Sequence, residues 1–489
     1  MTQPPNILIL LGLAALIAAA ADEAARQADR RTGWRAAGPF LLVAATPLVP
    51  NQPVLLGFSL DDVLPLFGVA MMIPMLPWRR IRSYRWHPSP GTTIAFIGIV
   101  TMIVAASLSA VLNAGEPFEL ARLLVRGAGR LAFLVVIVVS LAILGSSERS
   151  RTFSARAIAG VGIFEAVFGL VAYFVGLPMN AGLEAVRGSS VLIGTIPGRI
   201  SGTIGSSPNF TGAILMMSIL VTAGLALRST APRTRWWWWA AVVVQLGALT
   251  LTYTRISLGL VVLALVALVL LRSRPILLAP IGVVLALVAL FTPTLTRFVS
   301  DIPDRLALWT SAFLLMIDHP LAGVGPGRML DAVADSPERY RTTAFGQAWS
   351  TAHNTVLLAG AETGVLGAIG AIVLNLGLAV IVIQVFLRAP KGAAGSLQVA
   401  AALAMGVFLA QGMVNNLFTV GVTGVCAAFL LGTQLLDARL PDGAVDPTAL
   451  DATAVDPRGV PDTAPDSFAG AGPPNGRPAE DPLVTVDEG

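Results

Sequence analysis

Residues 365–387, VLGAIGAIVLNLGLAVIVIQVFL, decide the fold, because 23 successive positions carry no charged side chain. An α-helix needs about 20 apolar residues to cross the hydrocarbon core of a bilayer, where backbone amides find no water and must bond within their own segment. The whole chain has this character, with 55% apolar and 12% charged residues over 489 positions. The sequence therefore predicts an all-α polytopic membrane protein.

Similar apolar runs recur along the chain and predict twelve or thirteen membrane spans. The expected spans are residues 6–21, 37–57, 61–77, 91–112, 128–145, 155–176, 209–227, 236–252, 256–272, 275–292, 365–387, 396–413 and 416–436. We expect the first span to be retained, because no basic segment precedes it and no convincing cleavage site follows it.

Basic residues gather in every second loop between these spans, which is typical of cytoplasmic loops. They are Arg26, Arg30, Arg31 and Arg35; Arg79, Arg80, Arg82 and Arg85; Arg149, Arg151 and Arg156; Arg228, Arg233 and Arg235; Arg272 and Arg274; and Arg388 and Lys391. With thirteen spans, this pattern places the N-terminus outside, the C-terminus in the cytoplasm and the loop 293–353 on the extracytoplasmic face.

The runs divide the chain into four regions. Residues 1–292 form an N-terminal bundle of about ten spans with an external loop at 177–208, and residues 293–353 form a large extracytoplasmic loop with short helices. Residues 354–436 return to the membrane as the C-terminal helices. Residues 437–489 are rich in Pro, Asp, Ala and Gly without a helical period, so we expect a disordered acidic tail in the cytoplasm.

The net charge of +4 conceals two parts of opposite charge. Residues 437–489 carry eleven acidic and three basic residues, whereas the preceding part carries 29 basic and 17 acidic ones. The positive-inside pattern accounts for most of the basic excess, so the excess gives no support to nucleic-acid binding. The single cysteine, Cys426, excludes a disulfide or a cysteine metal site within one chain.

The loop 293–353 is about sixty mostly polar residues long, whereas most connections in packed folds have about 2 to 8. Its acidic residues lack the spacing of metal ligands, so we expect no metal and no other cofactor. Its segment 319–328, HPLAGVGPGR, matches neither a P-loop nor a dinucleotide loop. Gly323, Gly325 and Gly327 instead predict a tight turn with positive φ angles, packed closely against a neighbour.

Three arginines are expected on the external side, against the positive-inside pattern. Arg199 lies among small residues in the loop 177–208, Arg255 joins two apolar runs, and Arg305 starts an amphipathic helix in the loop 293–353. Each has an ordinary alternative: a plain turn, contact with lipid headgroups, or a solvated helix face. Together they indicate a site for a lipid-linked pyrophosphate, because a guanidinium offers phosphate oxygens a planar fork of donors.

His353 lies where this loop meets the next apolar run, in Ala352-His353-Asn354. A neutral imidazole takes a proton from a hydroxyl near pH 7, as a general base does when a sugar alcohol attacks an activated sugar. The alternative is a histidine held by structural contacts alone. Glu362, nine residues later, either orients the site or caps a turn.

The order of these motifs resembles the family of O-antigen ligases and O-antigen polymerases. They are Gly198-Arg199-x-x-Gly202, Thr252-x-Thr254-Arg255, Arg305-x-x-x-Trp309, the segment 319–327, Ala352-His353-Asn354-x-x-Leu357 and Glu362-x-Gly364-x-x-Gly367. The resemblance covers residues 199–387, and residues 319–367 are its most specific part. Thr254 stands before Arg255 where the family commonly has serine, which keeps a hydroxyl there.

The resemblance implies an inverting, metal-independent membrane glycosyltransferase with a GT-C-like helical bundle. Its donor would be a glycan on undecaprenyl pyrophosphate, and its acceptor a hydroxyl of a lipid, a glycan or a protein. Transfer would take place on the extracytoplasmic face of a bacterial cytoplasmic (inner) membrane. A ligase and a polysaccharide polymerase share these motifs, so both stay open.

The resemblance also implies a role for each site residue. His353 would be the catalytic base, and Arg255 and Arg305, with Arg199, would bind the pyrophosphate. The supporting residues would be Asn354, Glu362, Gly323, Gly325 and Gly327.

A secondary transporter or lipid flippase is the alternative from another class. Transporters often contain internal repeats and helices broken at mid-membrane. This sequence has no convincing repeat, and its polar residues gather on one face. A scaffolding protein would leave the external arginines and His353 unexplained, so we expect a glycan ligase or polymerase.

Overall fold

A computed structural model describes only part of the chain. The described residues are 36–48, 53–55, 58–78, 81, 88–175, 199–200, 202–203, 208–272, 302–340, 352–417 and 421–436. The predicted spans 6–21 and 275–292 and the tail 437–489 lie outside them. Contacts divide the chain into the units Met1–Ala444 and Val445–Gly489, and the second unit also lies outside the described residues.

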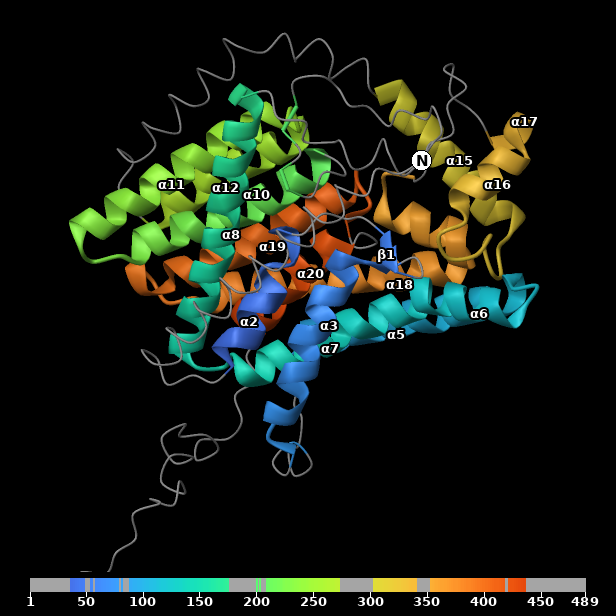
Figure 1. Cartoon of the computed structure of the whole chain (residues 1–489), viewed down its shortest axis with the longest axis horizontal. Coiled ribbons are helices and arrows are strands. Elements are labelled where there is room, and N and C mark those ends of the chain that lie inside the picture. The colour runs from blue at the N-terminus through green and yellow to red at the C-terminus, as the bar shows by residue number, and fades with distance from the viewer. Residues whose placement is uncertain are drawn as a thin grey trace, which may run out of the picture. The chain divides into compact units, whose positions relative to one another are not determined.

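The described residues are almost entirely helical (Figure 1). The longer helices are α5 (Pro90–Asn113), α7 (Arg130–Leu144), α8 (Glu148–Val175), α10 (Pro208–Arg228), α11 (Pro232–Leu251), α12 (Arg255–Arg272), α15 (Ile302–Asp318), α18 (Thr355–Arg388) and α19 (Ser396–Gly412). The shorter ones are α2 (Ala37–Ala44), α3 (Leu60–Met72), α6 (Pro117–Leu124), α16 (Met329–Asp335), α17 (Pro337–Tyr340) and α20 (Gly421–Leu430). Single turns of 3-10 or π-helix lie at Thr46–Leu48, Ile73–Met75, Val125–Gly129, Ala393–Gly395 and Leu431–Leu435.

Six of these helical stretches are long and apolar enough to cross a membrane. They are Pro90–Asn113, Pro117–Leu144, Glu148–Val175, Pro208–Arg228, Thr355–Arg388 and Ala393–Gly412, and three shorter apolar helices accompany them in the described residues. The predicted all-α polytopic membrane fold is confirmed. The number of twelve or thirteen spans stays a prediction.

The expected span 37–57 is wrong as a continuous helix. Helix α2 ends at Ala44, where the hydroxyl of Thr46 donates a hydrogen bond to the carbonyl of Val43 at 2.8 Å. A turn and a short antiparallel hairpin of β1 (Pro53–Leu55) and β2 (Phe58–Ser59) follow. Prolines at 47, 50 and 53 explain the break, because each lacks the backbone N–H that a helix requires.

Helix α10 lies at the centre of the bundle and packs against α8, α11, α12 and α19 (Figure 1). Almost all of its side chains are buried. Small residues allow its close contacts: a Cβ on Gly224 would lie 2.6 Å from the Cβ of Ala400 on α19. Close approach through glycine and alanine is typical of helix packing inside membranes.

Helices α5 and α18 pack along each other for most of their length (Figure 1). A Cβ on Gly91 of α5 would lie 2.8 Å from the backbone nitrogen of Ile381 on α18. A Cβ on Gly98 would overlap the backbone at Leu374, and one on Gly377 would overlap Ala95. The glycines therefore set the distance between the two helices.

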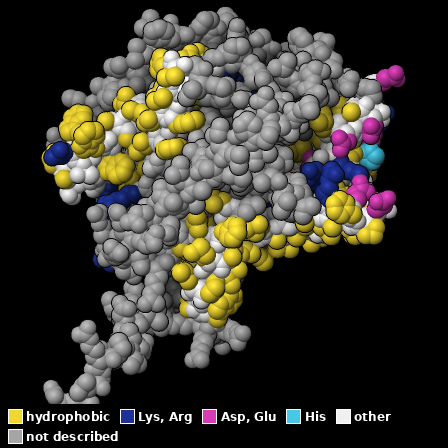
Figure 2. All heavy atoms as spheres, viewed as in Figure 1, with side chains coloured by type: hydrophobic (Ala, Val, Ile, Leu, Met, Phe, Trp, Pro, Cys, Tyr) yellow, Lys and Arg dark blue, Asp and Glu magenta, His cyan; other side chains and the backbone are white. Residues whose placement is uncertain are grey.

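The outer faces of these helices are apolar, as contact with lipid requires. Exposed hydrophobic side chains include Ile97 and Val104 on α5 and Ile369 and Ile372 on α18. Figure 2 shows hydrophobic side chains below the centre of the view and at its upper left, and Lys or Arg side chains at both its left-hand and right-hand sides. Acidic side chains gather at the right-hand edge, which is the region of α6 and α15–α17 in Figure 1.

Helix α15 is held against the first half of α18. A Cβ on Gly360 of α18 would lie 2.5 Å from the sulfur of Met316 on α15, so the small residue makes room for the neighbouring helix. At the same, C-terminal end of α15, Asp318 accepts hydrogen bonds from the Arg339 guanidinium at 2.5 Å and from the Tyr340 hydroxyl at 2.8 Å. The loop 293–353 thus contains an ordered helical unit, and its residues 341–351 lie outside the described part.

Candidate functional site

The start of α18 is fixed to the turn that follows α19. The side-chain oxygen of Asn354 accepts the backbone N–H groups of Val356 at 2.9 Å and Leu357 at 3.0 Å, so Asn354 caps the helix. Its Nδ2 donates to the carbonyl of Met413 at 2.8 Å. The hydroxyl of Thr355 donates to the carbonyl of Gly412 at 3.0 Å. The residue before the cap, His353, is therefore held beside residues 412–415.

His353 has a φ of 47°, in the left-handed region that residues other than glycine rarely adopt. The imidazole forms a hydrogen bond with the side chain of Asn415. Burial, together with the positive charge of Arg305, lowers the pKa of His353 from 6.5 to about 4. The imidazole is therefore neutral near pH 7 and able to accept a proton.

Arg305 lies in the first turns of α15, as the sequence predicts for the start of a helix. Its Nη1 donates to the carbonyl of Val414 at 2.6 Å, in the same turn that contacts Asn354. Its charge acts on the neighbouring His353. Two predicted site residues, one in α15 and one just before α18, therefore lie together.

The same turn leads to the N-terminal ends of α12 and α10. Gln411, at the end of α19, accepts a hydrogen bond from the hydroxyl of Ser257 on α12 at 2.9 Å. Its Nε2 donates to the carbonyl of Asn209 on α10 at 3.4 Å. The hydroxyl of Thr254 joins these two helices directly by donating to the carbonyl of Pro208 at 3.1 Å. Polar contacts thus connect the ends of α10, α12 and α19.

Arg255 is the first residue of α12, and Arg199 lies against the turn just before it. The Nε of Arg199 donates to the carbonyl of Thr252 at 2.7 Å, and the N–H of Ile200 donates to the carbonyl of Leu251 at 3.0 Å. Arg199 is therefore bound to a turn that reaches Arg255 three residues later. The polar contacts through Ser257 and Gln411 connect this turn with the part of the site that holds Arg305 and His353.

The three glycines of the segment 319–328 do form the predicted turn. Gly323, Gly325 and Gly327 have φ angles of 60°, 104° and 75°. The N–H groups of Val324 and Gly325 donate to the carbonyls of Ala361 and Glu362, both at 3.0 Å. A Cβ on Gly323 would overlap the backbone of residues 361–363, so the predicted close packing is confirmed.

This turn fits into a break in α18 at Gly364, whose backbone has φ 76° and ψ −174°. The break frees carbonyl groups that a continuous helix would use, and the turn satisfies them with its own N–H groups. In return, the N–H of Val365 donates to the carbonyl of Pro320 at 2.9 Å. The glycine turn is a structural joint between the loop and the membrane helix.

Glu362 belongs to this joint. Its carboxylate accepts the backbone N–H groups of Gly327 and Met329, at the start of α16, and lies near Arg126. Of the two roles open from the sequence, capping a turn is the one that these contacts support. The described contacts of Glu362 lead away from His353.

Sequence reasoning missed Gln411 and Asn415, which connect the predicted residues. Both belong to the run Gln411-Gly-Met-Val-Asn415-Asn416 between two apolar spans. A glutamine and two asparagines at the boundary of apolar runs are the signal that would have found them.

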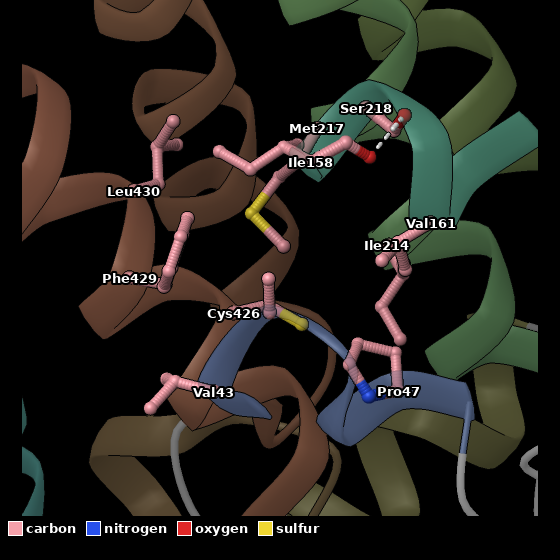
Figure 3. Close-up of a pocket in the computed structure, with 11 residues that line it drawn as sticks. Val43, Pro47, Ile158, Val161, Ile214, Met217, Ser218, Cys426, Phe429 and Leu430 are labelled. Carbon is pink, nitrogen blue, oxygen red and sulfur yellow. Dashed lines mark hydrogen bonds between the residues drawn. The ribbon is translucent and has the colours of Figure 1, made fainter. Parts of the chain in front are cut away.

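A separate pocket lies between α2, α8, α10 and α20 (Figure 3). Its lining is almost entirely apolar, with Met217, Cys426 and Phe429 among the residues. The hydroxyl of Ser218 is engaged, because it donates to the carbonyl of Ile158 at 3.1 Å. No residue predicted for the site lines this pocket, so we place the candidate site at the polar helix ends instead.

Among the described residues, no three side chains of His, Cys, Asp or Glu are grouped to hold a metal ion. The predicted independence from metal stays a prediction, because residues 293–301 and 341–351 lie outside the described part.

Comparison with known families identifies one match, the family model described as O-antigen ligase, at residues 240–372. The matched segment contains Arg255, Arg305 and His353, whereas Arg199 precedes it. No match is found among curated proteins. The family match supports, in general terms, a function of the O-antigen ligase or polymerase type. The predicted resemblance is thereby confirmed: residues 240–372 of this multi-pass membrane protein match the O-antigen ligase family.

Proposed function

We propose that the protein is an inverting glycosyltransferase of the O-antigen ligase type. It moves a glycan from undecaprenyl pyrophosphate to an acceptor hydroxyl on the extracytoplasmic face. The observation that carries the proposal is that His353 and Arg305, both within the matched segment, lie together beside the turn 412–415. A proton acceptor and a fixed positive charge, side by side, are what transfer from a diphosphate needs.

In the proposed reaction, His353 takes the proton of the acceptor hydroxyl as its oxygen attacks the anomeric carbon of the donor sugar. The bond between that carbon and the pyrophosphate oxygen breaks with inversion, and undecaprenyl pyrophosphate leaves with the electron pair. Arg305 and Arg255, with Arg199, offset the negative charge that grows on the leaving group. These guanidinium groups would do this without a divalent cation.

Burial and the charge of Arg305 both lower the pKa of His353, and in the proposed reaction Arg305 binds the diphosphate of the donor. An imidazole with a pKa of about 4 is a weak base, and the charge of Arg305 is one cause of that low value. A bound diphosphate would pair with Arg305 and cancel part of its effect, which raises the pKa of His353. The base would then become stronger only after the donor has bound.

The distribution of basic residues supports the extracytoplasmic side. The site lies at the N-terminal ends of α10, α12 and α18, whereas Arg228 and Arg388 lie at the opposite ends of α10 and α18. Arg233 and Arg235 likewise lie at the start of α11, away from the site. By the positive-inside rule, these basic ends face the cytoplasm of an inner membrane.

The substitution His353→Ala tests the proposal directly. We expect transfer from a lipid-linked glycan by the purified protein to fall by about a hundred- to ten-thousand-fold, as when a positioned base is lost. His319→Ala is the matched control, because His319 is an exposed histidine at the end of α15. Near-normal transfer by His353→Ala would contradict the general-base role, and a wild-type protein without transfer would contradict the proposed function.

The products in cells distinguish ligase from polymerase. If the gene is deleted, a lost ligase leaves full-length glycan chains on the lipid carrier, whereas a lost polymerase leaves single repeats. Restoring the gene with His353→Asn should reproduce the deletion pattern if the same site does the transfer. Normal glycans with an altered distribution of the lipid carrier across the membrane would point to a flippase instead.

A further inference from the structure

Glu165 is a buried carboxylate that the proposed reaction does not use. It lies on α8, within a candidate membrane span, and has no exposed surface. Both of its oxygens accept hydrogen bonds from one residue: Thr203 donates its hydroxyl to Oε1 and its backbone N–H to Oε2, the latter at 3.0 Å. Burying a carboxylate costs free energy, so an acidic group within a membrane span is a candidate for a functional role.

The contact depends on a glycine next to Thr203. Gly202 has a φ of 59°, and a Cβ there would overlap Oε2 of Glu165. The backbone can therefore approach the carboxylate only because Gly202 lacks a side chain. The motif Gly198-Arg199-x-x-Gly202 thus places a required glycine three residues after Arg199.

Other contacts make the segment that carries Arg199 a tightly held one. Ile200 is fully buried, and a Cβ on Gly169 of α8 would lie 2.5 Å from its Cγ2. Its N–H donates to the carbonyl of Leu251, and Arg199 donates to the carbonyl of Thr252. Arg199 and Ile200 are thus bound to the turn before α12, and Thr203 is bound to Glu165.

We infer that Glu165 is a positioning residue, which acts through Thr203 and the backbone of residues 199–203 to hold Arg199 for the diphosphate of the donor. This inference rests on the proposed function. Two hydrogen bonds from Thr203 to the buried carboxylate fix both the position and the orientation of the chain that carries Arg199. Holding this part of the chain is the role that the inference gives to Glu165. Glu165 does not touch the donor, so its loss weakens donor binding without removing the base.

The test measures transfer by the purified full-length protein at varied concentrations of a lipid-linked glycan. Glu165→Gln keeps the size of the side chain, but its amide group cannot accept at both positions. We expect KM for the donor to rise about tenfold, the usual effect of losing a hydrogen bond to a charged group, with kcat changed less than about threefold. Glu148→Gln is the matched control, an exposed acid at the start of the same helix, and should leave both constants unchanged.

The pair Thr203→Val and Thr203→Ser tests the same contact from the other side, and does so even if Glu165→Gln fails to fold. Valine removes the hydroxyl and should raise KM for the donor, whereas serine keeps the hydroxyl and should leave KM near the wild-type value. Equal KM values for valine and serine would overturn the inference.

A double substitution separates positioning from general stability. If Glu165 acts through Arg199, Glu165→Gln should raise KM in the wild type but add less than about twofold to the effect of Arg199→Ala. Effects that multiply would overturn the inference while leaving the proposed function intact. No effect of Arg199→Ala on KM would also overturn it, whereas loss of transfer in His353→Ala would still support the proposed function.

Discussion

Lowering the pH from 7 to 5 should destabilise the folded protein through His353 by an amount that can be worked out. Its pKa in the folded state is about 4, below the ordinary value of 6.5, because burial and the charge of Arg305 disfavour the protonated form. Between these two values the unfolded chain binds a proton that the folded chain does not. The stability contribution of the neutral imidazole is therefore complete above pH 6.5 and is lost as the pH falls toward 4.

The size of the effect follows from the two pKa values. Each unit of pH inside the window changes the free energy of unfolding by about 1.4 kcal/mol, less near the edges. From pH 7 to pH 5, the loss attributable to His353 is about 2 kcal/mol. A loss of this size is a substantial fraction of the stability of a typical protein.

The assay compares wild type with His353→Asn by denaturant titration in detergent micelles at pH 7, 6 and 5. Asparagine tolerates the positive φ at this position and does not titrate. The other histidines are common to both proteins, so the difference between the two pH dependences isolates His353. Equal pH dependences would refute the reasoning, as would an imidazole NMR signal, absent from the variant, that titrates near pH 6.5.

Three further substitutions test the neighbouring contacts. Arg305→Gln removes the positive charge beside His353 and should raise the pKa of its imidazole; NMR titration checks this, and an unchanged or lower pKa contradicts it. Gly323→Ala should destabilise the fold by about 2 to 4 kcal/mol, because a Cβ there meets backbone at a positive φ, whereas Gly247→Ala has open space and should be neutral; equal denaturation midpoints would refute the contrast. Asn354→Ala should lose about 1 to 2 kcal/mol through the uncapped helix, and Asn354→Ser should recover part of it; no recovery would mean that the cap is not the cause.

The helical membrane fold could be predicted because its signal is local. The apolar run 365–387 predicts a membrane span on its own, without information from the rest of the chain. The failure at 37–57 has a local cause too, since its prolines are visible in the sequence but are outweighed by the hydropathy of the run. The break at Gly364 is harder to predict, because it depends on a turn from residues 320–325 that supplies the missing hydrogen bonds.

The site was only partly predictable for the same reason. His353 and the arginines stand out because charged or titratable groups near apolar runs are rare. Their hydrogen-bond partners are mostly backbone carbonyls, such as those of Thr252 and Val414. Every residue has a backbone carbonyl, so the sequence does not indicate which carbonyls accept these bonds. The sequence shows Glu165 as an acid within an apolar run, but only the structure shows that Thr203 is its hydrogen-bond partner.

The end of α19 shows why these groups converge without any long-range sequence signal. The last carbonyls of a helix have no partner within it and must find donors elsewhere. Here Thr355 donates to the carbonyl of Gly412, the last residue of α19, and Asn354 and Arg305 donate to the carbonyls of Met413 and Val414 in the turn just after it. The negative end of the α19 dipole also favours a guanidinium at this place. The contacts that complete a helix end thus also fix the base and the charge, so a change that frays α19 at Gly412 should disturb donor binding and proton transfer together.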